Sequence, residues 1–327
     1  MTDIPNRPAP ERGAADWLRA QRLERTIRRL AEQIGERHAW KPHALHATAR
    51  MIAESFAAAG LVVEKQWYRA RGVEVANVEA RLPGRAGGNE VVIVGAHYDS
   101  LPKSPGANDN GSGVASLLEL ARALAGKEHQ HEVRFVAFVN EEPPFFQTPL
   151  MGSHVYASRC RERGEHITAM LALETMGYFS NEPGSQRYPF PYNLFYGNRG
   201  DFIGFVSNLR SVGVMRRCLR AFRRSSTLPA QGSPAPGWLP GVSWSDHWSF
   251  WRHRYPAVMV TDTALFRYPH YHTPEDTPDK VDFPSLARVV DGLVGVVGDL
   301  AGAVTGDRSR GAAAGDRPSL AVSSSAG

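Results

Sequence analysis

The chain has 327 residues, of which 42% are hydrophobic and 22% are charged, as in ordinary globular proteins. This length allows one large α/β domain or two small ones, with enough side chains for a sizeable core. The formal net charge of +5 comes from arginines scattered along predicted helices, without a basic stripe interleaved with aromatic residues, which argues against nucleic-acid binding. The two cysteines, Cys160 and Cys218, support neither a disulfide framework nor a cysteine metal site.

We expect no targeting or membrane segment. The N-terminal residues lack the apolar stretch of a signal peptide, and no stretch approaches the roughly 18 apolar residues of a membrane span. A cytoplasmic protein is therefore expected, unless a start site placed too far downstream hides an export signal. Residues 1–13 are expected to be flexible, and the Gly/Ala/Ser-rich residues 305–327 to form a disordered tail.

Hydrophobic periodicity predicts helices and strands over most of the chain. Apolar positions at helical spacing indicate helices, and runs of β-branched and aromatic residues indicate strands. In chain order, the expected elements are helices at 14–37 and 43–59, strands at 61–69, 73–82 and 91–96, a helix at 112–125, a strand at 132–139, a helix at 151–163, a strand at 168–173, helices at 211–224 and 246–252, a strand at 257–261 and a helix at 284–303.

The alternation of strands and helices predicts βαβ units and a largely parallel sheet. We expect one α/β domain over residues 14–304, with a mixed, mainly parallel central sheet flanked by helices. Residues 176–242 are less regular and are interpreted as an insertion that covers the site as a lid or pocket wall. Aromatic residues that could pack there are Phe190, Tyr192, Phe195 and Tyr196.

Three predicted buried strands are each followed directly by acidic or histidine side chains. These side chains are His97 and Asp99 after the strand at 91–96, Glu141 and Glu142 after the strand at 132–139, and Glu174 after the strand at 168–173. Because ligands of open α/β sheets bind at the carboxyl ends of the strands, we expect these groups to converge. With Asp109 and His272 they form a set of imidazole and carboxylate ligands that suits zinc or a similar divalent ion.

The histidine and aspartate motifs are each weak when taken alone. His97 and Asp99 share one face of an extended segment, so Asp99 can orient the metal environment from behind its ligands. Asp109 lies in the polar loop 106–113, where its two oxygens can bridge two cations. By itself, however, this loop favours a helix cap at Asp109 or Asn110, which is a common role for these residue types.

The adjacent glutamates Glu141 and Glu142 are more informative. If Glu142 binds a metal ion, Glu141 can face the water that the ion activates and act as general base. A solvent-facing acidic turn is the alternative, and it is less common directly after so apolar a strand. His272 lies in a proline-rich loop in which His270 is a competing ligand.

Together these segments resemble the zinc exopeptidase family that includes bacterial leucyl aminopeptidases and glutamate carboxypeptidase II. The resemblance covers roughly residues 90–303. The matching blocks are GAHYDS (95–100), GANDNGSG (106–113), NEE (140–142), MGSHVYA (151–157), LETMGY (173–178), SDHWSFW (245–251) and YHTPEDTPDKVD (271–282). A fold of the zinc exopeptidase type, related to that of glutaminyl cyclases, is what the resemblance implies.

The resemblance also implies two zinc ions per chain. It makes His97 and Glu174 ligands of one zinc, Glu142 and His272 ligands of the other, and Asp109 the bridge between them.

The catalytic residues are likewise implied by the resemblance. Glu141 becomes the general base, and Tyr271 matches a position that helps to stabilise the tetrahedral oxyanion in some members. Asp99 and Asp246 match supporting acidic positions, and Asp99 is counted with the catalytic residues. The expected activity is hydrolysis of peptides, with release of N-terminal residues by an aminopeptidase. The expected partner is a peptide substrate, with neither nucleic acid nor a membrane, and the sequence does not specify the oligomeric state.

Two departures from the family pattern concern substrate preference. Many aminopeptidases of the family have aspartate where this chain has Glu174, and the loop after Glu142 is longer, at residues 143–149. A carboxypeptidase of the same family therefore stays an alternative. A second alternative is a mono-zinc acyltransferase that resembles glutaminyl cyclases. Those cyclases resemble one another in having tryptophan at the position of Tyr271, so the tyrosine favours the peptidase. A non-catalytic binding domain is a third, and retention of all five ligands and the base argues against it.

Overall fold

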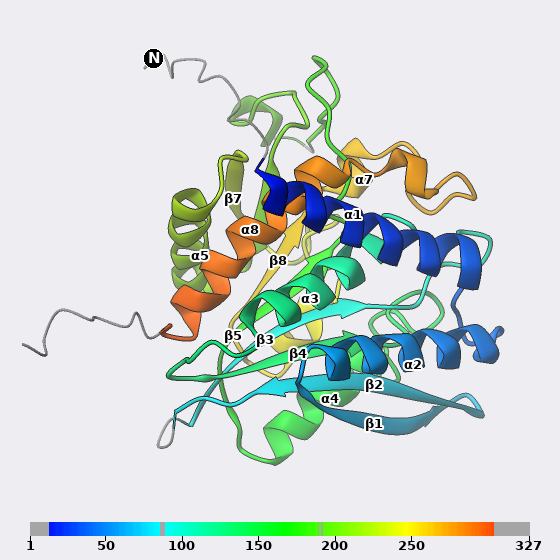
Figure 1. The fold of residues 1–327 in the computed structure, drawn as a ribbon. Coiled ribbons are helices and arrows are strands. Elements are labelled where there is room, and N and C mark those ends of the chain that lie inside the picture. Colours follow the sequence, from blue (N-terminus) through cyan, green and yellow to red (C-terminus); the bar gives the residue numbers. More distant parts are fainter. Residues whose placement is uncertain (1–12, 86–88, 189, 191, 304–327) are drawn as a thin grey trace, which may run out of the picture.

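An eight-stranded sheet, in the order β1-β2-β4-β3-β5-β8-β6-β7, organises the fold (Figure 1). The computed structural model describes residues 13–85, 89–188, 190 and 192–303. The predicted N-terminal flexible segment and C-terminal tail therefore lie almost wholly outside the described residues. The strands are β1 (Val62–Ala70), β2 (Val73–Leu82), β3 (Glu90–His97), β4 (Glu132–Phe138), β5 (His166–Glu174), β6 (Ile203–Ser207), β7 (Ala230–Pro234) and β8 (Ala257–Thr261).

The middle of the sheet is parallel and its margins are mixed. Strands β4, β3, β5 and β8 run parallel to one another. On one side the β1–β2 hairpin joins β4 antiparallel through β2, and on the other β6 pairs antiparallel with β8. Strand β7 pairs parallel with β6 at the other edge. This arrangement confirms the predicted mixed, mainly parallel sheet.

Helices cover both faces of the sheet (Figure 1). The larger core lies under α1, α2, α3, α5 and α8, and the smaller core lies under α4 and α6. The helices are α1 (Ala14–Arg28), which continues as a π-helical turn (Arg29–Ile34), α2 (Pro42–Ala58), α3 (Gly111–Leu124), α4 (Gly152–Glu162), α5 (Val212–Ser225), α6 (His247–Arg252), α7 (Ala264–Arg267) and α8 (Phe283–Leu300).

Local capping chemistry explains where two helices begin. The side chain of Asn110 accepts a hydrogen bond from Gly113 N at 3.1 Å, and that of Asp282 accepts one from Ser285 N at 3.0 Å. These bonds satisfy amide groups in the first turns of α3 and α8, which have no partner within the helix.

Most predicted elements are present, and the missed ones lie mainly in residues 176–242. Strand β6 is only five residues long, which is too short for a clear periodicity. Strand β7 has the sequence AQGSP, and glycine and proline are uncommon in strands. The short helix α7 was also not predicted. The 176–242 segment thus contributes two strands to the main sheet as well as irregular loops.

Two predictions from composition concern other features of the chain. Cys160 and Cys218 are both free and buried. Within the described ranges, no helix combines the length and the apolar character that a bilayer crossing requires.

The topology brings the predicted ligand positions to one edge of the sheet. In the parallel ladders, His97 pairs in register with Phe138, and Glu174 pairs with Thr261. The carboxyl ends of β3, β4, β5 and β8 therefore lie side by side, and the loops that follow them meet there.

Replacing Gly95 with alanine should destabilise the sheet. A Cβ at Gly95 on β3 would lie 2.3 Å from Cε2 of Phe138, whose ring is fully buried against Tyr156 and Phe250. We expect Gly95→Ala to lower the free energy of unfolding by about 1–3 kcal/mol in denaturant titrations. The control is Gly213→Ala in α5, where a Cβ meets no atom within 4 Å and should stabilise the helix. Equal stability of Gly95→Ala and the wild type would contradict this packing.

Candidate metal centre

Five side chains converge beyond the carboxyl ends of the parallel strands. They form two groups of possible metal ligands, and in each group the ligand atoms lie within 4.8 Å of one another. The first group is His97, Asp109 and Glu174, and the second is Asp109, Glu142 and His272. All five predicted ligands are thus brought together, and His272 rather than the competing His270 belongs to the second group.

Asp109 presents a different oxygen to each group. Its Oδ1 lies 3.4 Å from Nε2 of His97, and its Oδ2 lies 3.1 Å from Nε2 of His272. Nε2 of His97 is also 3.3 Å from Oε2 of Glu174, and Nε2 of His272 is 3.6 Å from Oε2 of Glu142. Tetrahedral zinc with bonds of about 2.0–2.1 Å separates its ligand atoms by about 3.3 Å, so the spacing in both groups fits such an ion.

The electrostatics of the cluster also favour the binding of cations. Burial raises the pKa of Glu141 and Glu142 well above the ordinary range, and neighbouring carboxylates raise it further. Burial would raise the pKa of Asp109 too, but the adjacent imidazoles of His272 and His97 lower it. Among the described residues, Nε2 of His97 and Oε1 of Glu142 are buried without a hydrogen-bond partner. Divalent cations would bind these atoms and offset the repulsion between the carboxylates, so the residues fit a metal centre.

Two further carboxylates hold the backbone of the ligand-bearing loops. Asp99 accepts hydrogen bonds from Glu141 N and Glu142 N, one on each oxygen and both at 3.1 Å. Asp276 accepts in the same way from Asn108 N at 2.8 Å and Asp109 N at 3.0 Å. Asp99 therefore fixes the backbone of Glu141 and Glu142. Asp276 fixes the backbone that leads to Asp109 in the same way.

The loop that carries Asp109 is tied to the end of β5 by its other polar side chains. Asn108 Oδ1 accepts from Gly177 N, and Asn110 donates from Nδ2 to Leu173 O and accepts at Oδ1 from Thr175 N. Since Asn110 also caps α3, the capping role belongs to Asn110 and leaves the carboxylate of Asp109 facing both histidines. These bonds place Asp109 and Glu174 relative to each other.

Three residues at the centre adopt left-handed backbone conformations. Their φ angles are 60° at Asn140, 41° at Thr175 and 61° at His272. Residues other than glycine rarely adopt this conformation, and such strain concentrates at functional sites. Here each occurrence lies at or next to a predicted ligand or the predicted base.

The predicted catalytic residues surround the two groups. Oε2 of Glu141 lies 3.9 Å from Nε2 of His97, yet Glu141 belongs to neither metal group. The ring of Tyr271 stacks on that of His272 at 3.8 Å. Asp246 is fully buried, and both its oxygens are without a hydrogen-bond partner among the described residues. Ser245, next to it, donates from Oγ to Oε2 of Glu174 at 2.7 Å.

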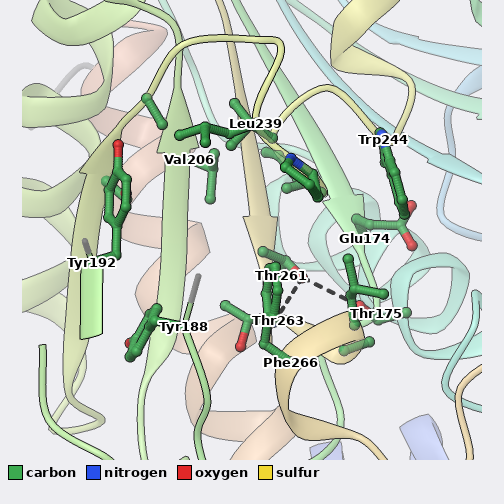
Figure 2. Close-up of a pocket in the computed structure, with 18 of the residues that line it drawn as sticks. Glu174, Thr175, Tyr188, Tyr192, Val206, Leu239, Trp244, Thr261, Thr263 and Phe266 are labelled. Carbon is green, nitrogen blue, oxygen red and sulfur yellow. Dashed lines mark hydrogen bonds between the residues drawn. The ribbon is translucent and has the colours of Figure 1, made fainter. Parts of the chain in front are cut away.

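A mainly apolar pocket of about 110 Å³ opens beside the metal centre (Figure 2). Glu174 and Tyr271 belong to its lining, and Tyr188 and Tyr192 stand at the side away from Glu174. Of the predicted aromatic group, Tyr192 therefore does line the pocket, whereas Phe190 and Phe195 are exposed. Other walls come from β6, β8, α7 and the loop before α6, through Val206, Met259, Phe266, Leu239 and Trp244.

Sequence reasoning missed several residues of the site. Asp276 lies in the matching block YHTPEDTPDKVD (271–282), but nothing in the sequence indicates its role. Tyr188 lies outside all the matching blocks. Arg37 donates hydrogen bonds to Tyr98 O, next to the predicted ligand His97, and to Gly106 O, in the loop before Asp109. It has no local sequence signal, because it is one of many arginines in an arginine-rich segment. Only the three-dimensional contacts reveal these residues.

Comparison with known sequences decides the family. A sequence profile of peptidase family M28 matches residues 77–297. The chain belongs to peptidase family M28. This match confirms the resemblance inferred from the sequence, and in this M28 chain all five predicted metal ligands lie within the matched residues.

Two relatives show how far the M28 similarity extends. The uncharacterized protein YfbL of Escherichia coli K12 is 39% identical over 283 residues, which cover 84% of this chain and 86% of YfbL. The probable leucine aminopeptidase 1 of Trichophyton verrucosum is 27% identical over 240 residues, 69% of this chain and 58% of the relative. The chain thus spans less than two thirds of the fungal relative.

Solved structures share the fold at low sequence identity. A zinc aminopeptidase from Bacillus subtilis, BSAP, superposes with a TM-score of 0.68 at 18% identity, over 86% of this chain and 95% of that one. The glutaminyl cyclase of Fimbriiglobus ruber gives a TM-score of 0.66 at 20% identity, over 91% of this chain and 99% of that one. The M28 chain therefore has a fold that peptidases and cyclases share.

Removing divalent ions should destabilise the protein. Without cations the buried carboxylates repel one another, and binding to the folded state alone stabilises by about 2.7 kcal/mol at a ligand concentration of 100 Kd. We expect EDTA to lower Tm in differential scanning calorimetry and added zinc to restore it. EDTA already saturated with zinc is the control and should have no effect. An unchanged Tm after complete chelation would count against a metal centre.

Proposed function

We propose that this M28 peptidase is a two-zinc aminopeptidase that releases the N-terminal residue of peptides. The observation that carries the proposal is the position of Asp109, which offers one oxygen to each of two ligand groups. Aminopeptidases among the relatives and structural neighbours support it.

The roles of the side chains follow from their positions. When bound, zinc polarises the scissile carbonyl and lowers the pKa of a water. Glu141 lies beside the first group without joining it, so its carboxylate can accept the proton of the attacking water and return it to the leaving amine. Burial raises the pKa of Tyr271 well above its ordinary value, which keeps the phenol protonated and able to donate to the oxyanion.

The pocket explains which end of the substrate is bound. The carboxylates of Glu141 and Glu174 favour a positive charge, as in a free α-amino group. Among the described residues that line the pocket there is no lysine or arginine to bind a C-terminal carboxylate, and this favours the aminopeptidase over the carboxypeptidase. The mainly apolar lining and the small volume of about 110 Å³ suit a single apolar side chain.

A glutaminyl-cyclase-like acyltransferase is the alternative, since cyclases share the fold. That activity is expected to need one zinc. The second group, with Asp109, Glu142 and His272, and the tyrosine at position 271 favour the peptidase.

Substitutions should separate the base from the bridging ligand. We expect Glu141→Gln to retain two zinc ions per chain by elemental analysis but to lower kcat by about 10²–10⁴-fold, because it removes a proton acceptor. Asp109→Ala should lose zinc as well as activity, because it removes a ligand of both ions.

The two variants serve as controls for each other. Loss of zinc from Glu141→Gln would show that the division of roles between Glu141 and Glu142 is wrong. A wild-type enzyme that is fully active with one zinc would favour the cyclase alternative instead.

The end preference can be tested with matched substrates. Leucyl anilides and peptides with a free N-terminus should be hydrolysed, and their N-acetylated counterparts should not, because acetylation removes the charge and adds bulk beside Glu141 and Glu174. Initial rates with each pair of substrates measure this. Equal rates for free and acetylated substrates would rule out the aminopeptidase, and release of C-terminal residues alone would identify a carboxypeptidase.

A further inference from the structure

Arg37 is a buried cation, and among the described residues its guanidinium donates hydrogen bonds only to backbone carbonyls, while its backbone amide donates one to Oγ of Ser100. It lies between the π-helical turn and α2, and its residue is 1% exposed. Within the described part of the chain, its guanidinium forms no ion pair within 4.0 Å. Burial lowers its pKa to about 10, and nearby acids oppose that effect, so Arg37 is charged at neutral pH. Burying a charge without a carboxylate partner costs folding free energy. Such a residue is therefore expected to have a specific role.

Three of the carbonyl groups that the Arg37 guanidinium binds lie in the chain between His97 and Asp109. Nε donates to Tyr98 O at 2.9 Å, between His97 and Asp99. Nη1 donates to Pro105 O at 2.7 Å, and Nη2 donates to Gly106 O at 3.0 Å.

The loop that carries Asp109 is closed by a backbone hydrogen bond from Gly111 N to Gly106 O at 3.1 Å. Arg37 donates to the same carbonyl oxygen. Gly106 has φ 64°, and a Cβ there would lie 2.7 Å from Nη2 of Arg37. The loop therefore packs directly around the guanidinium.

The same residue anchors these loops to the N-terminal helix. Nη1 of Arg37 also donates to Leu30 O at 3.1 Å and to Gly35 O at 2.9 Å. In addition, Arg37 N donates to Ser100 Oγ at 3.1 Å, and Ser100 N donates to Arg37 O at 2.8 Å. Arg37 thus joins the segment 30–37 to residues 98–106, which lie 61–69 positions further along the chain.

We propose that Arg37 is a positioning residue of the metal centre, which sets zinc affinity by fixing the loops that carry His97 and Asp109. The planar fork of arginine is essential to this role, because a lysine ammonium cannot reach carbonyls in several directions at once. This extends the site to a residue outside the region matched by the family profile, residues 77–297. The inference rests on the proposed metal function.

The test measures zinc affinity directly, by competition of the metal-free protein with a fluorescent zinc chelator. Arg37→Met and Arg37→Lys should both bind zinc about 10- to 100-fold more weakly than the wild type, which is the usual effect of losing a group that orients metal ligands. Ser100→Ala is a milder change, because it removes the hydrogen bond from Arg37 N and the one that Ser100 Oγ donates to Ser104 O but keeps the guanidinium in place. It should weaken zinc binding in the same direction by less. It keeps the test decisive if Arg37→Met does not fold.

Arg134→Met is the matched control. Arg134 is also buried, but it lies near the start of β4, at the opposite end of that strand from the metal centre, and is paired with Glu132 and Glu165. This variant should lower Tm while leaving zinc affinity unchanged. Such a result separates a loss of stability from a loss of metal affinity.

Two results would overturn the inference about Arg37. One is wild-type zinc affinity in the Arg37 variants with only Tm lowered, which would make the residue merely structural. The other is full recovery in Arg37→Lys, which would assign the effect to charge rather than to hydrogen-bond geometry. The proposed function would instead be overturned if the wild-type protein bound no zinc, or if it bound no more zinc than the Asp109→Ala variant.

Discussion

The concentration of buried carboxylates at one edge of the sheet is the constraint on which the rest of the site depends. Asp99, Asp109, Glu141, Glu142 and Glu174 are all buried there. Burial and the neighbouring carboxylates raise the pKa of the three glutamates. Such a cluster is unstable in a protein interior unless cations occupy it. The parallel strands create the cluster, because their carboxyl ends meet at the same edge, and the cluster in turn selects divalent metal ions.

The surrounding polar side chains keep the ligand atoms free for metal. Asp99 and Asp276 accept hydrogen bonds from backbone amides, and Arg37 donates to backbone carbonyls. Because the backbone of the loops is satisfied in this way, the carboxylates of Asp109 and Glu142 need not serve as caps or turn residues. Buried polar groups are hydrogen-bonded in native structures, and here that requirement also determines the geometry of the site.

The convergence of the candidate ligands can be predicted from the sequence because their signal is local. His97 and Glu174 each end an apolar run, and parallel strands place such ends together without further information. By contrast, Arg37 and Asp276 act through partners that lie far away in the sequence, and an arginine or aspartate in a loop has many equally common roles. The strands β6 and β7 are hard to predict for another reason. Strand β6 has only the five residues IGFVS, β7 has the polar sequence AQGSP, and both depend on pairing with the sheet.

The central claim is that two cations bind on either side of Asp109, and anomalous X-ray diffraction at the zinc absorption edge tests it most directly. Crystals of the zinc-loaded protein should show two anomalous peaks about 3.5–4 Å apart, the usual separation in two-metal sites. One peak should lie among His97, Asp109 and Glu174, and the other among Asp109, Glu142 and His272. A single peak in fully loaded crystals, or peaks away from Asp109, would contradict the account.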